Sequence, residues 1–199
     1  TKQEIGLETA SINPGENVTY TPLLYDQADK SMKTEVALSI TDPSGSIVLE
    51  GGISTGERYF WQSPRYARPG KWSITASHGE LTSTKSFTVK EVKNISSDLN
   101  EGTLEVTNTG NVRYVDSIEI IIGDTPKQID LDLGIGESKS FDLYAPEGSY
   151  PIKINTDEII NTIGSVFLTG KAVDVKDSDR FSAKIPRTFW WIIGIIILL

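Results

Sequence analysis

One stretch of the sequence brings acidic side chains together at a spacing that suggests a hard cation. The segment "DLDLGIGE" (130–137) offers three carboxylates, those of Asp130, Asp132 and Glu137. Calcium takes about six to eight oxygen ligands, usually from one loop. Here apolar residues alternate with the acids, which is typical of a β-strand with one solvated face. We therefore expect no metal site in this segment, and the sequence points to no cofactor.

The sequence also contains few features that would mark a catalytic nucleophile or base. The chain contains one histidine, His78, and no cysteine, which excludes a two-imidazole site, a thiolate metal site and disulfides. G-x-S-x-G, H-E-x-x-H and P-loop motifs are absent. His78 lies in a predicted hairpin turn where nothing marks a catalytic partner. We predict that the protein is not an enzyme. Two carboxylates meeting in a solvent-open cleft would be the arrangement that contradicts this.

The net charge of the chain limits the kinds of molecule that we expect it to bind. The formal charge is −8 at pH 7. Binding to phosphate backbones requires a basic face, so nucleic acid is not an expected partner. A negative surface suits an ectodomain that must stay soluble and separate from its neighbours.

One segment of this acidic chain is rich in aromatic and basic residues. The segment "GERYFWQSPRYARPGKW" (56–72) mixes arginines with tyrosine, phenylalanine and tryptophan, residue types enriched at binding hot spots. Our candidates for a partner-binding patch are Arg65, Tyr66, Arg68 and Trp72. They would suit an acidic partner or a sugar ring. The competing interpretation is that the aromatics fill a core while the arginines are solvated.

Two sequons offer sites for covalent modification. Asn17-Val18-Thr19 and Asn94-Ile95-Ser96 match N-x-S/T, with no proline in the middle position. We expect Asn17 and Asn94 to accept N-glycans if the chain is secreted in a glycosylating host. The alternative is that both are plain polar turn residues.

The elements that must position these residues follow a period of two. "TEVALSIT" puts Val36, Leu38 and Ile40 on one face, and "DPSG" (42–45) then predicts a turn. About seven such strands in roughly the first ninety residues are typical of an all-β sandwich. A second set begins near Gly102, where "DSIEIIIGD" places Ile118, Ile120 and Ile122 on one face. The polar stretch between the two sets indicates a linker.

Two segments resemble known surface modules. "GTLEVTNTGNV … IDLDLGIGESKSFDLYAPEGSYPIKI" resembles CARDB-type Ig-like domains of archaeal and bacterial cell surfaces, with Asn108-Thr109-Gly110 ending a strand and Pro146 to Tyr150 closing another. "ITDPSG … RPGKWSITA … FTV" is similar to macroglobulin-like β-sandwich modules. The resemblance implies domains that act as spacers, adhesion modules or assembly contacts.

The C-terminal run "RTFWWIIGIIILL" is apolar from Phe189 onward. It supplies about half of the ~20 residues that cross a bilayer as a helix. Trp190 and Trp191 come first, after Lys184 and Arg187, an order typical of a helix entering the lipid headgroups. We expect the start of a transmembrane helix that the chain's end truncates, with the two tryptophans at the membrane interface.

Together these patterns predict an all-β fold of two tandem Ig-like sandwiches. The expected division is a sandwich at 1–91, a linker at 92–101, a second sandwich at 102–176, a stalk at 177–188 and the membrane segment at 189–199. We expect a non-catalytic, single-pass surface protein with extracellular N-terminal domains and a structural, adhesive or assembly role. Its partners would be other surface or membrane proteins and the bilayer, and a homo-oligomer is a further option. An accessory subunit of a membrane complex and a glycan-binding module remain as alternatives.

Overall fold

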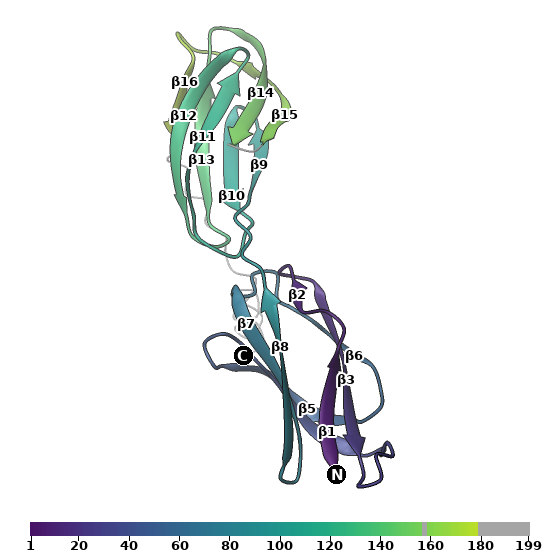
Figure 1. Ribbon diagram of the computed structural model, residues 1–199. Helices are drawn as coiled ribbons and strands as arrows, with labels where there is room; N and C mark the ends of the chain where they lie inside the picture. Colours follow the sequence, from purple (N-terminus) through teal and green to yellow (C-terminus); the bar gives the residue numbers. More distant parts are fainter. Residues whose placement is uncertain (157–158, 179–199) are drawn as a thin grey trace, which may run out of the picture. The chain divides into compact units, whose positions relative to one another are not determined.

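The computed structural model describes residues 1–156 and 159–178, and within them every regular element is a β-strand (Figure 1). The prediction of an all-β fold is therefore confirmed. In that part of the chain there is no helix of the length and apolarity needed to span a bilayer. The expected membrane segment, with Trp190 and Trp191, and the expected stalk from residue 179 onward lie outside the described residues.

The first eight strands form two sheets. A three-stranded sheet has the order β1-β3-β6 and a five-stranded sheet has the order β2-β8-β7-β4-β5. The pairing is antiparallel except between β2 and β8, which run parallel. The bounds are β1 Lys2–Leu7, β2 Ser11–Ile12, β3 Asn17–Tyr25, β4 Glu35–Thr41, β5 Ile47–Ser54, β6 Tyr59–Gln62, β7 Gly70–His78 and β8 Leu81–Val89.

One buried cluster joins these two sheets into a β-sandwich. Val36, Leu38 and Ile40 of β4 are buried, as their alternation predicts, and both sheets contribute side chains to the same core. The turn predicted at 42–45 is present, since the amide of Gly45 donates to the carbonyl of Asp42 at 3.0 Å. Gly45 has a φ of 86°, a conformation that glycine adopts without strain.

The remaining strands form two four-stranded sheets, with the orders β16-β13-β10-β9 and β12-β11-β14-β15. The predicted alternation in β11 is confirmed, because Ile118, Ile120 and Ile122 are all buried. The bounds are β9 Ile95–Asn100, β10 Thr103–Asn108, β11 Tyr114–Ile122, β12 Thr125–Leu133, β13 Ser138–Tyr144, β14 Gly148–Thr156, β15 Ile159–Leu168 and β16 Asp174–Asp177.

The expectation of an irregular linker at 92–101 is wrong for most of its length. Residues Ile95–Asn100 form strand β9, which pairs in a sheet with β10. The side chains of this strand alternate between half-buried and exposed. The sequence did not predict this strand, because only two apolar residues, Ile95 and Leu99, mark its inward face and all of its other residues are polar.

Contacts divide the molecule into two compact units. The first comprises Thr1–Ser97 together with Val106–Ile118 and Gln128–Ser138. The second comprises Asp98–Glu105, Glu119–Lys127 and the described residues after Ser138. The segments 106–118 and 128–138 thus belong to the same unit as the N-terminal sandwich, and most of the candidate residues lie in this first unit.

Candidate functional site

The arginine–tyrosine loop, Ser63–Pro69, links β6 of one sheet to β7 of the other. Its backbone is held at its N-terminal end. The amide of Ser63 donates to the carbonyl of Glu16 at 3.0 Å, and the amide of Gly15 donates to Ser63 Oγ at 2.9 Å. The amide of Ala67 closes a tight turn onto the carbonyl of Pro64 at 3.0 Å. These bonds fix the loop on a packed scaffold.

The loop presents three of the predicted side chains to solvent. Arg65 and Arg68 are exposed and Tyr66 keeps 38% of its surface accessible. The Arg65 guanidinium lies 5.5 Å from the centroid of the Tyr66 ring, within the range of a cation–π contact. This patch therefore offers a flat aromatic ring and two permanent positive charges on a fixed backbone.

The predicted partner contact of Trp72 is corrected by the structure. Trp72 is 3% exposed, and its ring packs among the aromatic rings of the core, 5.4 Å from Trp61 and 6.1 Å from Phe87 between centroids. Its Nε1–H donates to the carbonyl of Arg68 at 2.8 Å. Trp72 therefore anchors the end of the loop from inside the sandwich and offers no surface to a partner.

Within the first unit, the loop also meets the segments 106–118 and 128–138. The Nδ2 of Asn111 donates to the carbonyl of Ala67 at 2.8 Å. A Cβ added at Gly136 would lie 3.6 Å from the hydroxyl of Tyr66, so that ring packs beside Gly136. One side of the loop therefore has a structural role. The exposed side chains of Arg65 and Arg68 are the part of the loop that a partner could contact.

The sequence placed Asn108 at the end of a strand but predicted neither its burial nor any role for Asn111. Asn111 is 1% exposed, and it also donates to Lys90 O at 2.9 Å and accepts from Val92 N at 2.7 Å. Asn108 is fully buried, and its Nδ2 lies within 2.8–3.1 Å of three backbone carbonyls. Both belong to the "NTGN" turn, whose composition predicts a turn but does not distinguish a buried asparagine from an exposed one.

The two sequons both occupy accessible positions. Asn17 is exposed at the first residue of β3, where it pairs with Gln62 of β6. Asn94 is exposed just before β9, and its Nδ2 donates to Thr109 Oγ1 at 3.0 Å. An amide nitrogen carries two hydrogens, so a glycan on Asn94 is compatible with keeping this bond. Glycosylation at both sites stays a prediction.

The three carboxylates considered for calcium have separate partners. Asp132 receives two hydrogen bonds from Arg113, at 2.5 and 2.7 Å, and this hydrogen bonding, followed by the arginine's charge, lowers the pKa of Asp132. Asp130 accepts from Ser117 Oγ at 2.5 Å, and Glu137 accepts from the amide of Gly134 at 2.6 Å. In the part of the chain that the structure describes, no group of three acidic or histidine side chains is placed to hold a metal ion.

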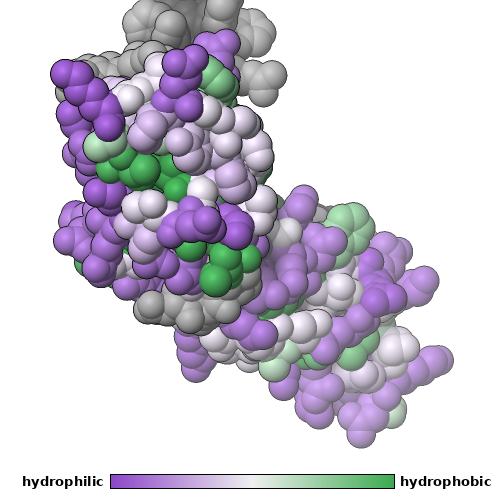
Figure 2. All heavy atoms as spheres, turned by 90° about the horizontal axis from the view of Figure 1, so that it is seen from above, coloured by the Kyte–Doolittle hydropathy of each residue, from purple (hydrophilic) through white to green (hydrophobic). Residues whose placement is uncertain are grey.

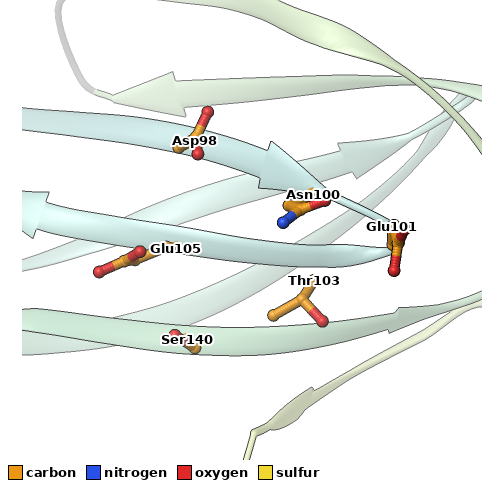
Figure 3. A pocket seen from close by; sticks show the side chains of 6 residues that line it. All are labelled: Asp98, Asn100, Glu101, Thr103, Glu105 and Ser140. Atoms are coloured by element: carbon orange, nitrogen blue, oxygen red, sulfur yellow. The ribbon is translucent and has the colours of Figure 1, made fainter. Parts of the chain in front are cut away.

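An acidic depression of about 160 Å³ lies in the second unit (Figure 3). It is lined by Asp98 and Asn100 of β9, Glu101 of the turn that follows, Thr103 and Glu105 of β10, and Ser140 of β13. Thr103 is already engaged, because its hydroxyl donates to Asp142 at 2.8 Å. Solvated carboxylates on the outer side of a sheet account for this feature.

The single histidine contacts a backbone carbonyl of a neighbouring strand. His78 is exposed at the end of β7, and its Nδ1 is 3.1 Å from the backbone carbonyl of Glu35. It lines an open groove together with Asp26 and Glu80. Its hydrogen-bond partner is a backbone oxygen, which gives the ring a structural contact between β7 and β4.

Comparison with known proteins gives a likeness in fold. No family model matches the sequence, and no curated protein sequence matches it either. Among solved structures, trypsin-activated alpha-2-macroglobulin from Escherichia coli is similar at 13% identity and a TM-score of 0.43, over 83% of this chain and 15% of that one. The BSP domain of a biofilm-associated protein matches at 12% identity and a TM-score of 0.33, over 83% of this chain and 29% of that one.

A segment of two fibronectin type-III domains from chicken tenascin is also similar, at 14% identity and a TM-score of 0.36, over 87% of this chain and 95% of that segment. The structural neighbours are thus Ig-like and fibronectin-type β-sandwiches among others. The chain spans only 15% and 29% of the first two proteins. At these identities and TM-scores the likeness does not bear on function, and the resemblance to CARDB-type domains stays a prediction.

Proposed function

We propose that this chain is a non-catalytic cell-surface protein with a structural, adhesive or assembly role, and that the arginine–tyrosine loop contacts a partner protein. The observation that carries the proposal is the loop itself. Two exposed arginines and a half-exposed tyrosine stand on a backbone fixed by hydrogen bonds and by buried Trp72. A patch that is already ordered loses little conformational entropy on binding, which favours recognition.

The chemistry of the loop suggests an acidic partner surface. The two arginines offer planar donors that match carboxylates, in a chain whose net charge is −8. The glycan-binding alternative needs an aromatic platform for a sugar ring. Trp72 is buried in the core, which leaves Tyr66 alone as an exposed ring of the loop, so a neighbouring protein is the stronger candidate. A partner held in fixed stoichiometry would make this chain an accessory subunit of a membrane complex.

The test is crosslinking in the native membrane, followed by capture with loop variants. We expect crosslinks from the loop to a neighbouring protein, and loss of capture by the double variant Arg65→Ala/Arg68→Ala. The matched control is Lys30→Ala/Lys33→Ala, which removes two exposed positive charges elsewhere on the same sandwich. Equal capture by both double variants would remove the loop from the contact. Absence of any crosslinked neighbour would refute the assembly role.

Membrane anchoring is part of the proposal and rests on the sequence from Phe189 onward. We propose a single-pass attachment with the N-terminal domains outside the cell. Membranes carrying the full chain should retain it after washing at high pH, whereas a chain ending at residue 178 should be released. Release of both chains would contradict the anchor without affecting the proposed contact at the loop.

A further inference from the structure

The free edge of β5 is the other conspicuous surface of the N-terminal sandwich. β5 is the last strand of the five-stranded sheet in the described residues, with β4 as its neighbour (Figure 1). Seven of its eight residues are exposed, and Ile47, Val48 and Leu49 leave 59%, 43% and 37% of their surface accessible. An edge strand has unpaired backbone N–H and C=O groups along its outer side, which is the template for adding another strand.

This edge lacks most of the features that keep natural edge strands from pairing. Such strands usually carry lysine or proline, or are very short. "IVLEGGIS" has neither lysine nor proline, and its length is eight residues. One register shift occurs opposite the Ile40/Thr41 step, so Leu49–Ser54 continues as a regular stretch. By contrast, the edge strand β2 of the same sheet has only two residues.

Other exposed apolar residues of the described chain are less suited to strand addition. Ile160 and Phe167 of β15 are each 61% exposed, but they are not adjacent in sequence, and the register shift at the Ile152/Lys153 step lies near the middle of this strand, whereas the shift in β5 lies at Val48, near its start. Elsewhere, the face seen in Figure 2 shows apolar residues in small patches that hydrophilic residues surround. The β5 edge therefore combines free backbone groups with three consecutive exposed apolar residues, Ile47–Leu49.

The charges beside this edge indicate what kind of strand fits it. Glu50 and Gly52 share the outer face of β5, because they are two residues apart in a strand. The side chain of Glu35 on β4 crosses over Gly52, since its carboxylate occupies the space that a Cβ at Gly52 would need. Within residues 1–156 and 159–178, neither Glu35 nor Glu50 forms an ion pair with a basic side chain. Two carboxylates thus flank the free edge without a positive partner.

We propose that the free edge of β5 adds an extended strand from a partner protein, and that this strand places a lysine or arginine beside Glu50 and Glu35. The proposal rests on the assembly role given above and specifies a second contact for it. A second copy of this chain is a poorer occupant, because its β5 would bring Glu50 toward the same carboxylates in a protein that already carries a charge of −8. Backbone hydrogen bonds would supply the affinity and the basic side chain the selectivity.

The experiment compares two acetylated and amidated peptide probes with the full chain. Both probes have nine residues of alternating threonine and valine, one with a central lysine and the other with a central glutamate. Opposite charges across strands attract and like charges repel, so with two carboxylates beside the edge we expect about ten-fold tighter binding of the lysine probe. Amide hydrogen exchange should show new protection on β5.

Variants then test the assignment to this edge. Glu50→Lys should abolish the preference between the probes, because the new positive charge at position 50 offsets the remaining carboxylate of Glu35. Glu80→Lys makes the same charge change in the exposed turn between β7 and β8 and should leave the preference unchanged. Raising the salt concentration should weaken binding of the lysine probe, since exposed charges are screened.

Three results would overturn the proposal: equal affinity for the two probes, a preference that Glu50→Lys does not alter, or protection on a strand other than β5. Self-association of the full chain without peptide, with β5 protected, would also overturn it, because a second copy would then occupy the edge. Each of these outcomes is separable from the proposed function. Crosslinking through Arg65 and Arg68 in the native membrane can succeed while the β5 probes fail, and the reverse result can also occur.

Discussion

Replacing Asn111 with alanine should destabilise the first unit far more than an ordinary turn substitution. The side chain is 1% exposed and takes part in three hydrogen bonds with the backbone, at 2.7, 2.8 and 2.9 Å. Each such bond contributes about 1 kcal/mol net, and a buried group left without a partner costs about 1–3 kcal/mol. Asn111→Ala leaves the amide of Val92 and the carbonyls of Ala67 and Lys90 without this partner. We therefore expect a loss of about 3 kcal/mol.

The measurement is the free energy of unfolding by denaturant, read together with amide hydrogen exchange. A chain with two compact units can unfold in more than one transition, so the transition must be assigned. The amide of Val92 provides the assignment, because it donates directly to Asn111 Oδ1. In the variant this amide should exchange faster, and the transition that exposes it should be the one that shifts.

The matched control is Asn94→Ala. Asn94 is exposed and its side chain makes one hydrogen bond, to Thr109. Exposed substitutions of this kind usually change stability by less than about 0.5 kcal/mol. A loss below about 1 kcal/mol for Asn111→Ala, or equal losses for the two variants, would refute the role given to the buried amide.

Three further predictions concern single features. Trp72→Phe should cost about 2 kcal/mol in chemical denaturation, because it leaves a loop carbonyl unpaired and a gap in the aromatic core; a loss under about 0.5 kcal/mol would contradict the anchor. Arg113→Gln should raise the pKa of Asp132, followed by NMR titration of its carboxyl group. Hydrogen bonding lowers the folded-state pKa of Asp132, so its stabilisation is present above the unfolded value of about 3.9 and is lost as the pH falls through the lower folded value. Expression in a glycosylating host should add one glycan mass at Asn17 and one at Asn94, each removed by substitution with glutamine; an unchanged mass would refute the site.

Much of the fold could be predicted because burial in a half-exposed strand imposes a period of two. Val36, Leu38 and Ile40 follow that rule, as do Ile118 and its neighbours in β11. The turn at 42–45 was predictable for a local reason, since Asp42 bonds to Ser44 and Ser46 and Gly45 adopts a positive φ. β9 was missed because Ile95 and Leu99 are the two apolar residues in its six, and polar Ser97 between them breaks the alternation.

The candidate site was harder to predict because its roles depend on contacts between distant segments. Trp72 has the residue type of a binding hot spot and also of a core, and only the packing of Trp61 and Phe87 around it decides between the two. Asn111 bonds to residues twenty and more positions away. No local pattern encodes such a bond. The exposure of Arg65 and Arg68, in contrast, is what the competing interpretation of this segment expected, because a charged side chain stays solvated unless it is paired.

The two proposed contacts draw on one continuous stretch of chain. β5, β6 and the arginine–tyrosine loop succeed one another between Ile47 and Pro69, and this stretch passes from one sheet to the other and back. Its charges are divided, with carboxylates beside the β5 edge and arginines on the loop. A partner with acidic and basic surfaces could therefore engage both without like charges meeting. If one partner uses both contacts, the losses caused by Glu50→Lys and by Arg65→Ala/Arg68→Ala should be additive in free energy, since the two sites share no side-chain bond. If two separate partners bind, each variant should weaken the binding of only one of them.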